Sequence, residues 1–147
     1  DHCNFDDCTA EGADGGTIYI IGARTTITSS NFTDSEAKSG GAIYIEGVDA
    51  SVYDSYFTNT HARTGTAYTN VNLGGAIYIK GDYAKISGSE FESSGAYSGG
   101  IIYLEGSYCD VNGSTFTDGY ASNDGGAIYS TGSYSNVIDS NFTDNLA

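Results

Sequence analysis

The chain has 147 residues, of which 19 are Asp or Glu and only 5 are Lys or Arg, so its formal net charge is −14. Because phosphate binding needs a basic face, we expect no nucleic-acid partner. Hydrophobic residues make up 39% of the chain, enough for one domain over 1-147, and no apolar run approaches the roughly 18 residues of a membrane span. Met is absent even at residue 1, which indicates a processed product or a segment of a longer chain.

The most regular feature of the sequence is a repeat built on paired glycines. Five Gly-Gly pairs begin at positions 15, 40, 74, 99 and 125. In every copy a Phe follows the second Gly by sixteen residues, at Phe32, Phe57, Phe91, Phe116 and Phe142. Phe5 marks a partial first coil over 1-14. Because the copies differ in length only between the Phe and the next Gly pair, we predict a loop insertion at 61-73 in the longest copy.

Each copy contains three short segments in which apolar residues alternate with other types. In the second copy these segments carry Ile43 and Ile45, then Val52, then Phe57, and the other copies repeat the same columns. A period of two predicts β-strands, and no segment shows the 3.6-residue stripe of a helix. Strands this short bury their apolar face only when successive copies stack in register. The sequence therefore predicts an all-β fold, a parallel β-helix of about five coils with three short strands and three corners per coil.

The segment FTDSEAKSGGAIY, residues 32 to 44, and its echoes along the whole chain also resemble a known family. The repeat looks like the polymorphic outer-membrane protein repeat of adhesin-like surface proteins, which pairs a GGA-(Ile/Leu/Val) motif with an FxxN motif. The Asn of the second motif is matched only loosely here. The resemblance implies a right-handed β-helix, an extracellular setting and an adhesive or structural role, and it implies no catalytic residues.

Cysteines and glycosylation sequons bear on the compartment. Cys3 and Cys8 flank Phe5 at the first coil, and we predict that they form a disulfide, with two free thiols as the alternative. Cys109 belongs to a column of small residues and is expected to be buried. Three sequons begin at Asn31, Asn112 and Asn141, at positions expected to face outward and to accept N-glycans. Together with the acidic charge, these features favour a secreted or cell-surface protein.

Catalytic and nucleotide-binding chemistry finds little support in the sequence. The chain lacks the GxSxG, GxGxxG and GxxxxGK motifs, and His2 and His61 belong to no patterned cluster. Asp54 and Asp139 share a column, but they are three coils and roughly 14 Å apart, too far for a glycosidase pair. We therefore expect no enzyme activity, no cofactor and no metal site. Acidic turns leave calcium binding open as an alternative to a solvated acidic surface.

The most informative expected surface feature is a column of tyrosines three residues after each Gly pair: Tyr19, Tyr44, Tyr78, Tyr103 and Tyr129. These residues alternate with the inward Ile column, so we expect them to face outward beside small residues as a flat amphipathic strip. Three interpretations remain open. The strip packs against another subunit or the insertion, it stacks against sugars, or it is a cross-strand aromatic ladder.

The leading functional hypothesis is an extracellular structural or adhesive module that self-assembles into fibres or surface layers. It rests on the lack of an evident polar cap at either end of the repeat, because uncapped solenoid ends expose strand edges and core. The alternative is a carbohydrate-binding module that uses the tyrosine column. A degraded polysaccharide-processing enzyme is the third hypothesis. The expected partners are thus other copies of the chain and, in the second hypothesis, glycans.

Overall fold

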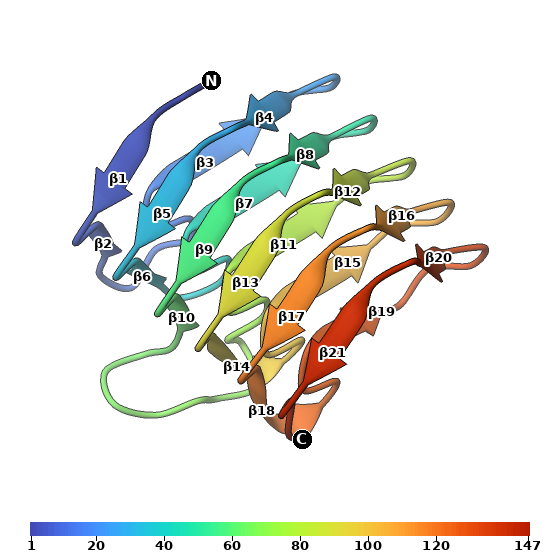
Figure 1. The fold of residues 1–147 in the computed structure, drawn as a ribbon. Helices are drawn as coiled ribbons and strands as arrows, with labels where there is room; N and C mark the ends of the chain where they lie inside the picture. The colour runs from blue at the N-terminus through green and yellow to red at the C-terminus, as the bar shows by residue number, and fades with distance from the viewer.

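The chain folds as a stack of short parallel strands that winds through about five coils. A computed structural model describes all residues 1–147, and these form strands, turns and no helix. Strands that are adjacent in a sheet come from successive repeats, so each coil lies directly on the one before it (Figure 1). The predicted all-β parallel β-helix is confirmed.

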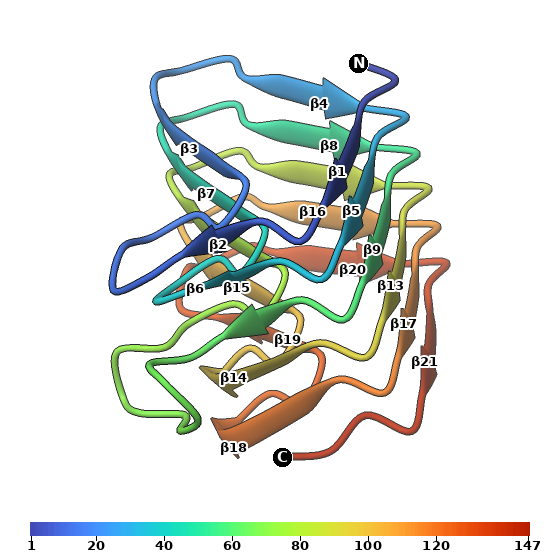
Figure 2. The ribbon, with the colours of Figure 1, turned by 90° about the vertical axis from the view of Figure 1, so that its left-hand side faces the viewer.

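Four sheets run along the stack (Figure 2). Sheet A, which carries the Phe column, comprises β1 (Asn4–Asp6), β5 (Asn31–Thr33), β9 (Tyr56–Thr58), β13 (Glu90–Glu92), β17 (Thr115–Thr117) and β21 (Asn141–Thr143). Sheet B comprises β2 (Thr9–Ala10), β6 (Glu36–Ala37), β10 (His61–Ala62), β14 (Gly95–Ser98) and β18 (Tyr120–Asp124). Sheet C comprises β3 (Ile18–Ile21), β7 (Ile43–Glu46), β11 (Ile77–Lys80), β15 (Ile102–Glu105) and β19 (Ile128–Ser130). Sheet D comprises β4 (Thr26–Thr28), β8 (Ser51–Tyr53), β12 (Lys85–Ser87), β16 (Asp110–Asn112) and β20 (Asn136–Ile138).

The prediction of three strands per coil is wrong, because sheet B adds a fourth. Sheets C, D and A correspond to the three predicted strands, and sheet B lies where the sequence indicated only a turn. Its strands β6 and β10 are two residues long, with a single inward alanine each, Ala37 and Ala62. Two residues are too few for an alternating pattern to show.

Each coil turns at four corners, and every corner contains a residue in the left-handed region of φ. Between β5 and β9 these residues are Asp34, Gly40, Asp49 and Asp54, with φ of 51°, 58°, 58° and 48°. The left-handed region is open to Gly and is more often visited by Asn and Asp than by other residues. Part of the acidic composition therefore serves the corners of the fold.

The core consists of inward ladders that continue from coil to coil. The inner four phenylalanines are fully buried, and successive rings lie 4.7 to 5.0 Å apart between centroids. Ile43 from sheet C and Val52 from sheet D pack into the same cluster. At the corner before sheet C the coils approach so closely that a Cβ on Gly41 would collide with the carbonyl oxygen of Gly75. This close approach accounts for the second Gly of each pair.

The insertion begins later than predicted, because His61 and Ala62 belong to β10. It is the long loop that leaves β10 in Figure 1. A fully buried amide fixes this loop: Asn72 Nδ2 donates to the Lys38 carbonyl over 2.9 Å, and Asn72 Oδ1 accepts from the Thr69 N–H over 2.6 Å. The loop is therefore hydrogen-bonded to the coil stack at its C-terminal end.

Candidate binding surfaces

The predicted tyrosine column forms one continuous ladder on sheet C, which we call the inner tyrosine ladder. Its members are Tyr19, Tyr44, Tyr78, Tyr103 and Tyr129. Ring centroids of successive members lie 4.9, 4.8, 5.2 and 5.2 Å apart. These distances place the rings in cross-strand contact along the whole stack.

The middle of the inner tyrosine ladder does not form the exposed strip that the alternation predicted. Tyr44 and Tyr78 are only 8% and 6% exposed, and each ring stands between two neighbouring rings. The flanking small residues, such as Ala42 and Ala76, are buried in the core. Tyr19, in the first coil, is 51% exposed. Of the three interpretations, this placement favours a structural cross-strand ladder.

Burial also changes the acid–base properties of the inner tyrosine ladder. It raises the pKa of Tyr44 to about 12, with a further contribution from the nearby Glu46 carboxylate. Burial likewise raises the pKa of Tyr78, whose hydroxyl donates to Glu105 Oε2. Both phenols are thus held neutral, and the Tyr78 hydroxyl is a hydrogen-bond donor. The middle of the ladder supplies packing and this hydrogen bond instead of an open binding face.

A second tyrosine ladder, which we call the outer tyrosine ladder, comprises Tyr83, Tyr108 and Tyr134 at the corner between sheets C and D. Ring centroids lie 5.3 and 5.0 Å apart, and the planes differ by 12° and 10°. The side chains are 49%, 47% and 73% exposed. We did not single out this ladder from the sequence, although its signal is present: each Tyr follows the corner Gly by two residues, as in Gly81-Asp82-Tyr83.

The outer tyrosine ladder lines a groove of about 380 Å³ together with Asp49, Lys85, Asp110 and Asn136. The last three residues occupy one column of sheet D, in register from coil to coil. Asn136 Nδ2 donates to Asp110 Oδ1 over 2.9 Å. The groove therefore offers apolar ring surface on one side and hydrogen-bonding side chains on the other.

A polar hollow lies near the corner between sheets A and B, next to the insertion. Asn59 Nδ2 donates a hydrogen bond to Asp34 Oδ1, which orients the Asn59 amide. Asn59 Oδ1 then accepts a hydrogen bond from His61 Nε2–H over 2.9 Å. The opposite ring atom, His61 Nδ1, accepts from the Tyr68 hydroxyl over 3.1 Å. Burial lowers the pKa of His61, and the charge of Arg63 adds to this effect. The hydrogen bonds thus hold a neutral histidine between the insertion and the coil stack.

Tyr68 from the insertion occupies the space over Gly95, which has no side chain to fill it. In sheet B, Gly95 pairs with His61 on one side and with Tyr120 on the other. A Cβ on Gly95 would collide with the Tyr68 hydroxyl. The Tyr68 ring centroid lies 5.7 Å from that of Tyr120 and 6.4 Å from that of His61. The insertion therefore supplies an aromatic side chain to the outward face of sheet B.

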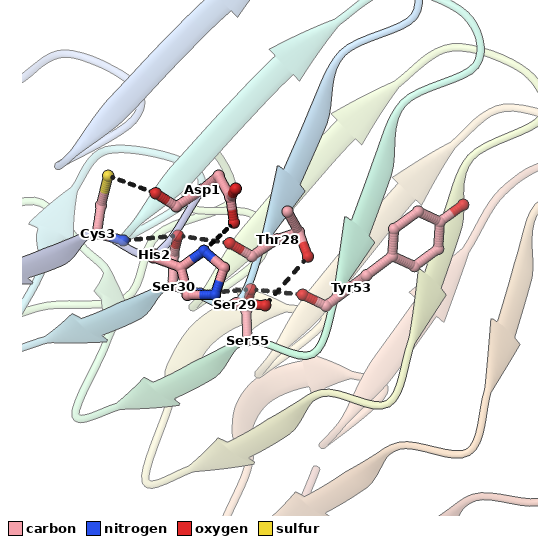
Figure 3. Close-up of polar contacts among 8 residues, drawn as sticks. All are labelled: Asp1, His2, Cys3, Thr28, Ser29, Ser30, Tyr53 and Ser55. Atoms are coloured by element: carbon pink, nitrogen blue, oxygen red, sulfur yellow. Dashed lines mark hydrogen bonds and ion pairs between the residues drawn. The ribbon is translucent and has the colours of Figure 1, made fainter.

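Cys3 begins a ladder of small hydroxyl side chains at the corner before sheet A (Figure 3). Its backbone N–H donates to Ser30 Oγ over 3.3 Å, and the Ser30 N–H donates to Ser55 Oγ over 3.2 Å. Ser30 Oγ donates in turn to the Thr28 carbonyl over 2.9 Å. Cys3 thus takes the position that serine holds in later coils, two residues before each Phe.

The predicted disulfide between Cys3 and Cys8 is not formed, since both residues are free thiols. They flank β1, whose extended residues hold them beyond opposite ends of the strand. An extended chain rises about 3.3 Å per residue, so residues 3 to 6 alone span about 10 Å. Bridging cysteines need Cα atoms within roughly 7 Å. Cys109 is buried as expected, and burial raises the pKa of its thiol.

The three sequon asparagines differ in accessibility. Asn112 in β16 and Asn141 in β21 are exposed, whereas Asn31 in β5 is half-buried. Asn31 Oδ1 is buried without a hydrogen-bond partner. Glycosylation stays a prediction for all three, and the geometry favours Asn112 and Asn141.

No three His, Cys, Asp or Glu side chains gather closely enough to hold a metal ion together. The fold also contains no helix of the length and apolarity needed to cross a membrane. Comparisons with protein-family models, curated proteins and solved structures found no match to this chain.

Proposed function

We propose that the chain is a non-catalytic extracellular structural or adhesive module that self-associates through its ends, in line with the family that its repeat resembles. The observation that carries this proposal is the exposed apolar core of the last coil. Val137 and Phe142 are 51% and 48% exposed, although the same two columns are buried in the inner coils. Covering them would remove a large apolar area from water.

The first coil offers a complementary surface for a second copy. Phe5, Ile18 and Ile20 are only partly buried, and they belong to the columns that continue through the stack. Pairing of β1 with β21 of a second copy would extend sheet A, and such a head-to-tail contact does not close on itself. Because sheet A has six strands and sheets C and D have five, this contact leaves one strand position empty in sheets C and D.

An extracellular setting is supported by the accessible sequon residues Asn112 and Asn141 and by the charge of −14. The charge also predicts how association responds to salt. Bodies with the same charge repel one another, and salt screens this repulsion. We expect self-association to strengthen as the salt concentration rises.

Sedimentation velocity over a range of protein and salt concentrations tests this proposal. We expect larger species at high concentration and high salt. Val137→Asp should abolish them, whereas Val48→Asp, an equal charge change at an exposed valine of the second coil, should retain them. A single monomeric boundary under every condition would refute end-to-end assembly. Equal loss in both variants would assign the effect to net charge instead of to the apolar end.

A further inference from the structure

We propose that the outer tyrosine ladder (Tyr83, Tyr108 and Tyr134) binds an uncharged linear glycan that lies along the axis of the coil stack. The ligand differs from the partner copies of the proposed self-association, and the site lies on the side of the stack. The loops that carry the ladder project side by side where sheet C meets sheet D (Figure 1). A ligand bound there would cross successive coils.

The ring geometry leaves aromatic surface free for a ligand. Stacked carbon atoms make contact at about 3.5 to 4.0 Å, whereas centroids in this ladder lie 5.0 and 5.3 Å apart with nearly parallel planes. Adjacent rings are therefore displaced sideways, as in offset stacking. Tyr108 has a neighbour on both sides and is still 47% exposed. Each ring thus presents part of a face to solvent, where the C–H groups of a sugar can pack.

The backbone gives an independent reason to assign a role to these tyrosines. Tyr83, Tyr108 and Tyr134 have φ of 62°, 59° and 60°, a region that is costly for a bulky residue and mild for Gly or Asn. The equivalent position carries Arg24 and Asp49 in earlier coils. Every corner of the coil contains a residue in this region, so the conformation itself belongs to the fold. The turn does not require a tyrosine at this corner in three successive coils.

The polar side of the groove repeats with the same period as the rings. Lys85, Asp110 and Asn136 each follow a ladder tyrosine by two residues and stay in register along sheet D. Each of the last three coils thus offers one ring and one hydrogen-bonding side chain, at a coil spacing of about 4.8 Å. A pyranose unit advances an extended β-linked chain by a similar length. The matching periods let successive sugar units meet equivalent sites.

Charge selects among linear glycans. The groove contains the carboxylates of Asp49 and Asp110 against the single ammonium of Lys85, on a body of charge −14. A polyuronate or sulfated chain would be repelled. Neutral sugar hydroxyls can instead donate to the carboxylates and accept from Lys85 and Asn136. The geometry and the charge together favour an uncharged glycan.

Calorimetric titration with four neutral probes tests the site: xylohexaose, cellohexaose, chitohexaose and mannohexaose. We expect at least one to bind, and Tyr108→Ala to weaken that binding tenfold or more. Tyr19→Ala removes an equally exposed tyrosine at the end of the inner tyrosine ladder, and it should change the affinity less than twofold. Thermal melts establish that both variants are folded. Binding of none of the four probes, or unchanged binding by Tyr108→Ala, would overturn the proposal.

Two further measurements distinguish the ligand class. A hexamer of galacturonate should bind at least tenfold more weakly than the best neutral probe at low salt, and equal affinity would contradict the assignment to uncharged glycans. Sedimentation of Tyr108→Ala should match that of the unmodified chain. If this variant lost self-association while Val137→Asp kept it, the outer tyrosine ladder would be an interface between copies and the glycan proposal would fail.

Discussion

The two tyrosine ladders are five residues apart in each of the last three coils, yet they have opposite surroundings. Tyr78 is 6% exposed and hydrogen-bonded to Glu105, whereas Tyr83 in the same coil is 49% exposed at a positive φ. The inner ladder stands on strands, where neighbouring coils bring rings and carboxylates around each phenol. The outer ladder stands on a corner, where the chain turns away from the stack. Residue type alone therefore does not decide burial in a solenoid.

The largest expected effect is a difference in stability between alanine variants of the two ladders. Tyr78→Ala should lower the free energy of unfolding by about 3 to 5 kcal/mol, because it opens a cavity between two rings and leaves Glu105 without its donor. Tyr108→Ala should cost less than about 1 kcal/mol. Chemical denaturation of both variants measures the difference. Equal losses would show that the outer ladder is as structural as the inner one.

Ionisation of the inner tyrosine ladder should destabilise the fold at high pH. The pKa of Tyr44 is raised above the unfolded value, so its contribution to stability is complete below pH 10 and is lost as the pH rises through about 12. We expect unfolding, followed by circular dichroism, to coincide with tyrosinate formation in this window. Tyr44→Phe should shift the transition to higher pH. A transition that the substitution leaves in place would contradict this origin.

A smaller effect is expected at low pH from the aromatic contact of the insertion. The pKa of His61 is lowered by burial, so stability present above pH 6.5 should fall as the pH drops through the lowered value. Melting temperatures above and below this range measure the loss. His61→Gln should remove the dependence, since Asp and Glu titrate mainly at lower pH. A pH dependence that survives this substitution would assign it to other groups.

The smallest expected effect concerns the corner backbone. Tyr108→Asn replaces a bulky residue at φ of 59° with one that adopts this region more readily, while it removes contacts with two neighbouring rings. These effects oppose each other, so we expect a stability change within about 0.5 kcal/mol. Denaturant midpoints measure it. A loss above about 2 kcal/mol would mean that ring stacking holds this corner together.

The sequence predicted the parts of the fold that depend on long periodic columns. The spacing from each Gly pair to its Phe predicted the coil register, and Phe32 does pair with Phe57 in sheet A. Sheet B was missed because strands such as β6 have two residues and one inward alanine. The start of the insertion was misplaced for the same reason, since β10 was read as part of the loop.

The candidate surfaces were less predictable because they depend on side chains from neighbouring coils. Alternation placed Tyr44 outside the Ile column, but its burial depends on Tyr19 and Tyr78, which the local pattern does not describe. The disulfide prediction relied on proximity in sequence, whereas β1 separates Cys3 from Cys8. Contact of Tyr68 with the face above Gly95 depends on the path of an insertion that has no repeat. The outer tyrosine ladder did carry a signal, the Gly-x-Tyr spacing.

The accessibility of individual tyrosine rings tests the division between the ladders most directly. Photochemically induced nuclear polarisation reports which rings a dissolved dye can reach. We expect strong signals from Tyr83, Tyr108 and Tyr134 and none from Tyr44 and Tyr78. Signals of equal strength from both groups would contradict the account.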